Sequence, residues 1–328
     1  MPVRRLNTVL PFAALLLLSL AGPVLAFDFG ESRHQRESAI QSIPLARLTP
    51  SARQRVEQII SRPTMFRRLP TQGMDCDRDM FLFLVRHPEV LVGIWDVMDI
   101  TQVQMQRTGP YNLVASDGQG TTCQIELVYG DAETHLYVAR GKYEGPMVAK
   151  PITGSGVFVL HSSYAQGGDR TTIGGQMDVF LELDSLGADL VVRTLGPLIG
   201  KSADHNFIET AKFITQISQA SEVNPSGVRK LGLQLPQVSE PVREGFIDTA
   251  IAVGLRNGNT IDPDEPLADN DSPWRSDSEV APSASAQVAR IAPSEAISGS
   301  TDSDDAFIDP VGGSSPVQPR KPTMNLRR

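Results

Sequence analysis

The sequence is poor in cysteine and in net positive charge, and each shortage excludes a class of function. Only two cysteines occur among 328 residues, which excludes a disulfide-rich scaffold and a cysteine-rich zinc module. The net charge of −8 has the wrong sign for a nucleic-acid-binding surface, so we expect no nucleic-acid partner. With 27 glycines and 24 prolines, the chain is not a collagen-like fibre. Hydrophobic residues make up 40% of the chain, which is enough to build a folded core.

Long hydrophobic runs are absent except near the N-terminus. Arg4 and Arg5 precede an apolar run over Leu10–Leu20, and small residues stand three and one positions before Phe27. This three-part pattern predicts a secretory signal peptide over residues 1–26, with a mature chain that begins near Phe27. An uncleaved anchor helix is the alternative, but the run is short for a hydrocarbon core of about 30 Å. We therefore expect a periplasmic or extracellular protein with no transmembrane segment after signal cleavage.

Charge and composition set the C-terminal part of the chain apart. Glu240–Arg328 contains 15 acidic and 8 basic residues, a net charge of −7, together with 10 prolines. Such a composition cannot bury enough apolar surface to offset the entropy cost of ordering. We expect residues 262–328 to form a disordered acidic tail rich in proline and serine, open to contacts with unidentified proteins of the cell envelope. Residues 238–261 are predicted to be a linker with a short helix over Glu244–Arg256.

The folded domain is expected over residues 74–237. Residues 27–73 precede it as a lead-in segment with one short helix over Ala52–Ser61. The domain itself begins with two helices, Asp77–Arg86 and Pro88–Met98, in which apolar residues recur at helical spacing.

Strand-like segments follow these helices. After Asp99 the period of the apolar residues changes to two. The alternating segments are short and are separated by turn signals such as Asp117-Gly118, so they predict an antiparallel meander and not βαβ units. We expect about six strands, the last of them over Ile173–Leu183.

The strongest amphipathic pattern lies near the end of the domain. After a break at Gly196-Pro197, a helix that Ser202 caps carries one continuous apolar stripe. The stripe consists of Phe207, Ile208, Ala211, Ile214 and Ile217. It needs an apolar partner, and the sheet is the only large one available. The sequence therefore predicts an α+β fold in which short helices precede a curved antiparallel sheet that packs on a long C-terminal helix.

This order of elements resembles the helix-grip fold of the START-like superfamily of lipid-transfer proteins and polyketide cyclases. The segment His87–Met98 is similar to the PE-x-V-W-x-x-L helix pair of that superfamily, with a longer spacing between Glu89 and Trp95. Ser202–Gln219 is similar to its gripping helix, and the resemblance covers roughly residues 76–221. It implies a sheet that curls around the long helix and leaves an apolar cavity for a lipid, a sterol or an aromatic polyketide.

Candidate pocket residues gather on one predicted strand. His135, Tyr137 and Tyr143 share strand parity, and the small residues Ala139 and Gly141 lie between the two tyrosines. Small residues between aromatic ones leave room, as a cavity wall would. Ordinary sheet packing is the alternative interpretation of the same pattern.

Two further residues complete the candidate pocket, for which we expect a hydrophobic small molecule as the ligand. His161 lies in a neighbouring predicted strand, and Ala211 lies in the apolar stripe. The five histidines and two distant cysteines form no metal-ligand set. We therefore expect no metal and no cofactor, and we assign no catalytic residues.

Export changes the interpretation of Cys76 and Cys123. An oxidising compartment allows two thiols to pair, and the bond would close a loop of about 48 residues and stabilise the fold by roughly 3–4 kcal/mol. We expect this disulfide, with two buried free thiols as the alternative.

Taken together, these patterns predict an exported, non-catalytic binding protein with an apolar pocket for a lipid or an aromatic small molecule. The alternative is a structural or protein-interaction component of the cell envelope that holds no ligand. The volume of the cavity discriminates between the two, since ligand sites usually enclose roughly 300 Å³ or more.

Overall fold

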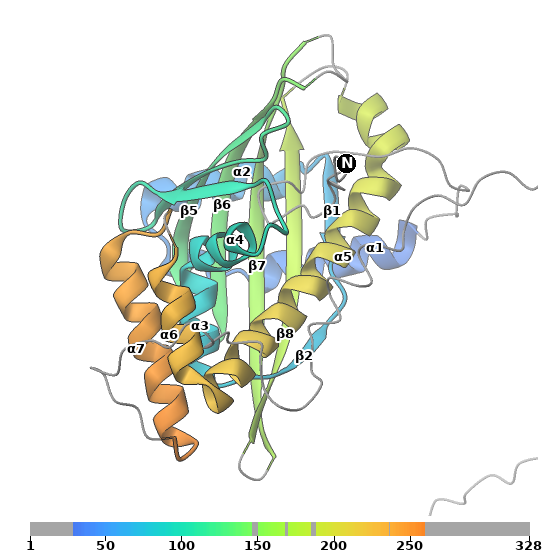
Figure 1. Ribbon diagram of the computed structural model, residues 1–328. Coiled ribbons are helices and arrows are strands. Elements are labelled where there is room, and N and C mark those ends of the chain that lie inside the picture. The colour runs from blue at the N-terminus through green and yellow to red at the C-terminus, as the bar shows by residue number, and fades with distance from the viewer. Residues whose placement is uncertain (1–28, 146–149, 168–169, 185–187, 236, 260–328) are drawn as a thin grey trace, which may run out of the picture. The chain divides into compact units, whose positions relative to one another are not determined.

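The computed structural model describes five stretches of the chain, drawn as coloured ribbon in Figure 1. They are residues 29–145, 150–167, 170–184, 188–235 and 237–259. The chain divides into two units, Met1–Arg290 and Ile291–Arg328, and every described residue belongs to the first. The signal peptide predicted for residues 1–26 and the tail predicted for residues 262–328 lie outside the described residues.

An eight-stranded, curved antiparallel sheet forms the centre of the first unit (Figure 1). The strands are β1 (Met65–Arg68), β2 (Gln72–Asp75), β3 (Gln104–Arg107), β4 (Asn112–Ser116), β5 (Thr121–Gly130), β6 (Thr134–Tyr143), β7 (Ile152–Gly167) and β8 (Arg170–Leu183). Their order is β1-β8-β7-β6-β5-β4-β3, and β2 also pairs with β8. The strands predicted for the meander are β3 to β8. The remaining two come from the segment expected to be a lead-in.

Two turns show why the meander folds as it does. Asp131 Oδ1 accepts hydrogen bonds from the backbone amides of Glu133 and Thr134, at 2.8 and 2.7 Å, and so closes the hairpin between β5 and β6. In the turn between β4 and β5, Asp117 Oδ1 likewise accepts hydrogen bonds from the backbone amides of Gln119 and Thr121, at 2.8 Å each. Gly118 adopts a φ of 67° there, a left-handed conformation that favours glycine.

Five helices cover one face of the sheet, which we call the inner face. They are α3 (Arg78–Arg86), α4 (Pro88–Val97), α5 (Ala188–Val223), α6 (Pro225–Leu233) and α7 (Glu240–Arg256). The Asp77 side chain caps α3 by accepting hydrogen bonds from the amides of Asp79 and Met80. Figure 1 shows α5 crossing this face diagonally. The arrangement confirms the predicted α+β class and the long helix packed on the sheet.

The long helix α5 begins earlier than the sequence suggested. It spans 36 residues from Ala188 and continues through Gly196 and Pro197, where we expected a break. Ser202 is therefore an internal residue of α5 and not its N-cap. A proline removes one backbone hydrogen bond of a helix and bends it, but packing of the flanking turns can keep the helix continuous.

The opposite, outer face of the sheet is covered by the N-terminal segment. It contains α1 (Phe29–Ser42), a short 3₁₀ helix (Leu45–Arg47) and α2 (Pro50–Ser61). Val56, Ile59 and Ile60 of α2 pack against the outer face. The segment 27–73 thus supplies a helical layer, β1 and the first half of β2, where we expected one short helix.

The segment predicted as a linker, 238–261, holds α7 over Glu240–Arg256. Phe246, Ala250 and Val253 of α7 are fully buried, and they belong to the same core as the inner face. The packed unit therefore extends past Gln237 as well as before Met74.

Candidate ligand-binding site

Small residues form a patch on the inner face of three neighbouring strands. Cys123 of β5 lies opposite Gly141 of β6, which lies opposite Gly154 of β7. One step along, Ala139 of β6 lies opposite Gly156 of β7. Glycine within a strand often marks a place where another group approaches the backbone closely. The predicted pattern of small residues between Tyr137 and Tyr143 therefore continues across the sheet.

Side chains around this patch keep a small accessible surface although α5 covers them. The exposed fraction is 5–8% for each member of this inner ring. The ring consists of Tyr137, Ala139, Phe158, Leu160 and Leu181 from the sheet and Phe207, Ala211 and Ile214 from α5. Other side chains on both faces are more completely buried. Ile173, Val179 and Ile217 of the inner core are 0–1% exposed, and Leu136, Val157, Val159 and Phe180 of the outer face are 0% exposed, although Val138 there is 7% exposed. The residual surface is thus concentrated at the inner ring without being confined to it.

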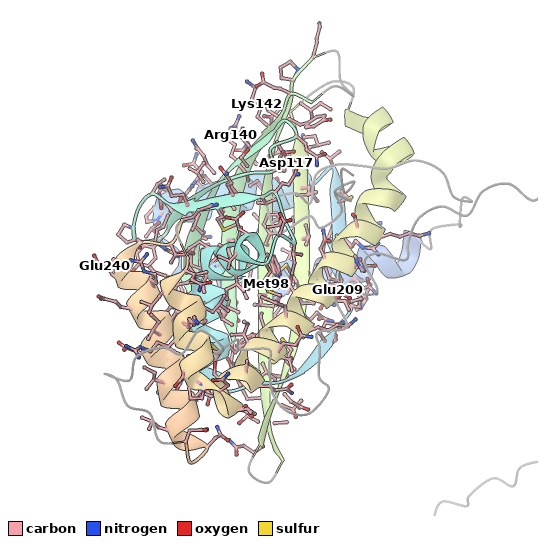
Figure 2. The ribbon with its side chains drawn as sticks, in the orientation of Figure 1. Met98, Asp117, Arg140, Lys142, Glu209 and Glu240 are labelled. Atoms are coloured by element: carbon pink, nitrogen blue, oxygen red, sulfur yellow. The ribbon has the colours of Figure 1, made fainter. Side chains whose placement is uncertain are left out.

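Ala211 stands in the middle of the α5 contribution to the inner ring. Phe207 precedes it by one turn and Ile214 follows it by one turn, so the three side chains share one face of the helix. Glu209 lies on the other side of α5 (Figure 2), where it forms an ion pair of 2.8 Å with the exposed Lys212. Phe207, Ala211, Ile214 and Ile217 of the predicted stripe are therefore buried in the core, whereas Ile208 is only half-buried.

The two candidate tyrosines are buried on the inner face, and each has a packing role. The Tyr137 hydroxyl donates a hydrogen bond to the backbone oxygen of Val85 and so ties β6 to the end of α3. Burial raises the pKa of Tyr137 far above its ordinary value. The ring of Tyr143 lies across Gly145, where a Cβ atom would come within 2.2–2.3 Å of it. Both tyrosines lie on the same face of β6, as strand parity predicts.

The two candidate histidines lie on opposite faces of the sheet. His135 is fully buried on the inner face, where Arg86 Nε donates a hydrogen bond of 3.2 Å to its Nε2. His161 lies on the outer face, where its Nε2 is 3.0 Å from Ser42 Oγ of α1. The structure therefore places His135, Tyr137 and Tyr143 on one face of β6, with His135 and Tyr143 near opposite ends of the strand, and it separates His161 from them.

The predicted disulfide between Cys76 and Cys123 is not formed, and both residues are buried free thiols. The Cys76 amide bonds to Thr171 at the start of β8, whereas Cys123 lies in line, through Gly141 and Gly154, with Leu183 at the end of β8. Twelve residues of strand separate these positions, or roughly 40 Å at about 3.3 Å per residue. A disulfide needs Cα atoms within about 7 Å, so the sheet holds the two thiols much too far apart.

A buried ion pair that the sequence analysis did not identify joins the helix pair to the edge of the sheet. Glu89 of α4 is 1% exposed, and Arg107 of β3 donates to both of its carboxylate oxygens, at 2.5 and 3.0 Å. Burial alone would raise the pKa of Glu89, but hydrogen bonds from His87 and Arg107 outweigh it and hold the pKa below its ordinary value. The His87-Pro88-Glu89 motif was visible in the sequence, but its partner 18 residues further on was not.

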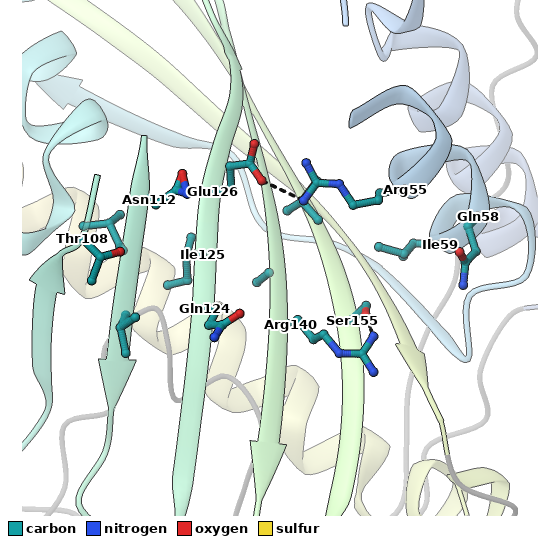
Figure 3. Close-up of a pocket in the computed structure, with 14 residues that line it drawn as sticks. Arg55, Gln58, Ile59, Thr108, Asn112, Gln124, Ile125, Glu126, Arg140 and Ser155 are labelled. Atoms are coloured by element: carbon teal, nitrogen blue, oxygen red, sulfur yellow. Dashed lines mark hydrogen bonds and ion pairs between the residues drawn. The ribbon is translucent and has the colours of Figure 1, made fainter. Parts of the chain in front are cut away.

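A concave surface that was missed from the sequence lies on the outer face beside α2 (Figure 3). It is a groove of about 440 Å³ between α2 and strands β4 to β7. Arg55 of α2 and Glu126 of β5 form an ion pair of 2.7 Å in it, and Gln124 and Arg140 add further polar atoms. Figure 2 shows Arg140 and Lys142 along this side of the sheet. Arg55 and Glu126 pair with each other, and Arg140 pairs with Asp184 outside the groove at 3.2 Å, so the groove differs in character from the apolar inner ring.

Two features of the described residues concern metal binding and membrane crossing. In the part of the chain between residues 29 and 259 that the structure describes, no three histidine, cysteine or carboxylate side chains cluster as a metal site would require. None of the helices described there combines the length and apolar character needed to cross a bilayer.

Comparison with known proteins finds similarity only at the level of structure. No protein-family model matches the chain, and no curated protein matches it either. Solved structures that are similar to part of this chain include a conserved protein from Geobacillus kaustophilus, with 13% identity, a TM-score of 0.33, and coverage of 44% of this chain and 93% of the other. A START superfamily protein from Mycobacterium smegmatis is 12% identical, with a TM-score of 0.28 and coverage of 47% and 97%.

A norcoclaurine synthase from Thalictrum flavum, in complex with a transition-state analogue, is also 12% identical, with a TM-score of 0.28 and coverage of 45% and 95%. START-like neighbours are thus found at low identity and partial coverage, as the predicted weak resemblance led us to expect. The identities are too low for the activity of any of these proteins to be transferred to this chain.

Proposed function

We propose that this chain is an exported binding protein that holds an apolar small molecule, a lipid or an aromatic compound, between the inner face of the sheet and α5. The observation that carries the proposal is the inner ring, whose members from β6, β7, β8 and α5 keep 5–8% of their surface exposed beneath a covering helix. A close-packed side chain keeps almost no such surface, as Phe180 beneath α1 and α2 and Ile217 of α5, both 0% exposed, illustrate. An apolar lining with few polar groups suits a hydrophobic ligand.

The polar groups near the inner ring favour binding over catalysis. The Tyr137 hydroxyl is engaged by a backbone oxygen, and Arg86 is held by His135 and by the backbone oxygen of Asp131. Both thiols are protonated at neutral pH, because burial raises the pKa of Cys76 to about 12 and that of Cys123 to about 11. Neither cysteine is therefore an activated nucleophile.

Export is part of the proposal and rests on the sequence of residues 1–26. The intact mass of the protein recovered from outside the cytoplasm tests this directly. A chain that still carried residues 1–26 would contradict it.

A protein-interaction role is the second candidate, and the outer groove is the observation that favours it. The groove offers paired charges and amide side chains beside an exposed stretch of sheet, which suits a polar partner better than an apolar ligand. In that case the inner ring would be collapsed around its own side chains.

Filling the inner ring separates the two candidates. Ala211→Leu adds three carbon atoms at the centre of the ring, and Lys212→Leu adds a similar apolar group on the exposed side of α5. We expect the wild type and Lys212→Leu to bind the apolar fluorophore 1-aminoanthracene equally, and Ala211→Leu to bind it at least about tenfold more weakly while melting within a few degrees of the wild type. Unfolding of Ala211→Leu, or a wild type that binds no fluorophore, would favour the interaction role.

A further inference from the structure

The two ring nitrogens of His135 have different surroundings. Nε2 accepts a hydrogen bond from Arg86 Nε, and Arg86 is itself held in place by donating from Nη2 to the backbone oxygen of Asp131 at 3.1 Å. An arginine can only donate hydrogen bonds, so His135 Nε2 must carry the lone pair. Burial and the charge of Arg86 lower the pKa of His135 to about 4, so the ring is neutral. Its single proton is therefore on Nδ1.

The protonated Nδ1 has no hydrogen-bond partner among the described residues. The same is true of the hydroxyl of Ser162. His135 is 0% exposed and Ser162 is 6% exposed, so neither side chain is freely hydrated at the surface. Buried polar atoms are almost always satisfied in folded proteins, because leaving a donor without an acceptor is costly. Two such atoms on one face of the sheet indicate a place where an oxygen is bound.

The strand register places the two groups side by side. His135 of β6 lies opposite Leu160 of β7, and Ser162 is two residues further along β7 on the same face. Diagonal neighbours of this kind have Cβ atoms roughly 7 Å apart, close enough for one oxygen atom to contact both side chains.

This polar position adjoins the inner ring. Gly175 lies opposite Ser162, and a Cβ atom on Gly175 would be 2.9 Å from Met74 Cε, 3.9 Å from Leu160 and 4.0 Å from Phe207. Met74, Leu160 and Phe207 therefore converge beside Ser162, so apolar side chains of the ring and of β2 adjoin the two unpaired hydrogen-bonding groups.

We propose that His135 Nδ1 and Ser162 Oγ bind an oxygen atom of the ligand, so that the site selects apolar molecules that carry a neutral hydrogen-bond acceptor, such as a ketone, over hydrocarbons of the same shape. This inference rests on the proposed function, because it assigns the polar end of the same site. A single bound water is the competing occupant of the position, and it gives no such selectivity.

A matched pair of probes tests the proposal in the wild-type protein. 2-Acetylnaphthalene and 2-isopropenylnaphthalene have the same planar shape, but only the first carries a carbonyl oxygen. We expect the ketone to bind about tenfold more tightly, the effect of one buried hydrogen bond. Equal binding of the two probes would overturn the selectivity and leave the apolar site intact. A wild type that binds neither probe would overturn the proposed function and the selectivity with it.

Two substitutions at His135 then assign the effect to one nitrogen. His135→Asn keeps a donor near the position of Nδ1, whereas His135→Gln keeps an acceptor near the position of Nε2 for Arg86. The preference for the ketone is a ratio within each variant, so it is insensitive to losses of stability that weaken both probes. We expect the preference to persist in His135→Asn and to fall below about twofold in His135→Gln and Ser162→Ala. The opposite order, or an unchanged preference in all three variants, would contradict the assignment.

Discussion

Arg107 at the end of β3 holds both carboxylate oxygens of Glu89 in the first turn of α4, with Nε 2.5 Å from one oxygen and Nη2 3.0 Å from the other. The same guanidinium donates to the backbone oxygens of Arg86 and Pro110. One side chain thereby joins the end of α3, the start of α4 and the edge of the sheet. This junction fixes the angle at which the helix pair enters the inner face.

Removing the charge of Glu89 should destabilise the protein strongly. Glu89→Gln leaves the guanidinium of Arg107 buried without its counter-charge, and breaking a buried pair in this way typically costs about 3–5 kcal/mol. Glu209→Gln, which breaks the ion pair with the exposed Lys212, should cost no more than about 0.5 kcal/mol. Urea unfolding of the two variants measures the difference, and similar losses in both would show that the buried pair is not a structural junction.

Stability should fall as the pH is lowered from 6.5 towards 4, because of His135. Its pKa is about 4 in the folded protein, lowered by burial and by Arg86 and only partly opposed by Asp131, against about 6.5 when unfolded. Between these pH values the unfolded chain binds a proton at His135 that the folded chain does not. The free energy of unfolding is therefore unaffected by His135 above pH 6.5 and decreases as the pH falls towards 4. The full decrease is about 3 kcal/mol. His135→Gln should reduce the acid-induced loss by about that amount, and an unchanged pH profile would contradict the buried neutral histidine.

The stability losses caused by large-to-small substitutions along α5 should show which side chains lie beside an empty space. Ile217 is 0% exposed and Ile214 is 5% exposed, although both belong to the same apolar stripe. Truncation of a close-packed side chain costs about 2–5 kcal/mol, and a side chain beside an empty space has already lost some of those contacts. We therefore expect Ile217→Ala to be clearly more destabilising than Ile214→Ala, with Lys212→Ala within about 0.5 kcal/mol of the wild type. A larger loss of stability for Ile214→Ala than for Ile217→Ala would show that the empty space does not lie beside Ile214.

The two cysteines should react with a thiol reagent only after unfolding. Both are buried, and the pKa of each thiol is raised by burial, to about 12 for Cys76 and about 11 for Cys123. Thiol titration should find no fast-reacting group in the native protein and two in denaturant without reductant. A peptide map that showed Cys76 linked to Cys123 would contradict the strand register derived above.

Local patterns in the sequence predicted the central elements. The helices around Phe81 and Trp95, the alternating strands and the apolar stripe of α5 each follow from a period that a short window reveals. The same is true of the row from His135 to Tyr143, since parity within one strand fixes which residues share a face.

The strands that the sequence patterns did not predict depend on partners far along the chain. Met65–Arg68 forms β1 although half of it is arginine, because Arg67 pairs with Asp204 of α5 and Arg68 pairs with Asp178 of β8. Four residues of mixed character give no strand signal on their own.

The two predictions that were wrong, the place of His161 and the cysteine pair, depend on the register between strands. His161 could be placed relative to His135 only once Leu160 was known to lie opposite His135. The proposed cysteine pair failed for the same reason, because sequence separation says nothing of position along a shared sheet. That His135 Nδ1 lacks a hydrogen-bond partner likewise becomes visible only once Arg86 is known to bond to Nε2.

Native mass spectrometry of the protein purified from its own host tests the central claim most directly. The account predicts that the wild type carries a bound apolar molecule, released under denaturing conditions, that contains at least one oxygen atom. It also predicts that Ala211→Leu, prepared in the same way and equally folded, has the mass of the bare chain. A wild type recovered only as the bare chain, and equally unable to take up either naphthalene probe, would contradict the account.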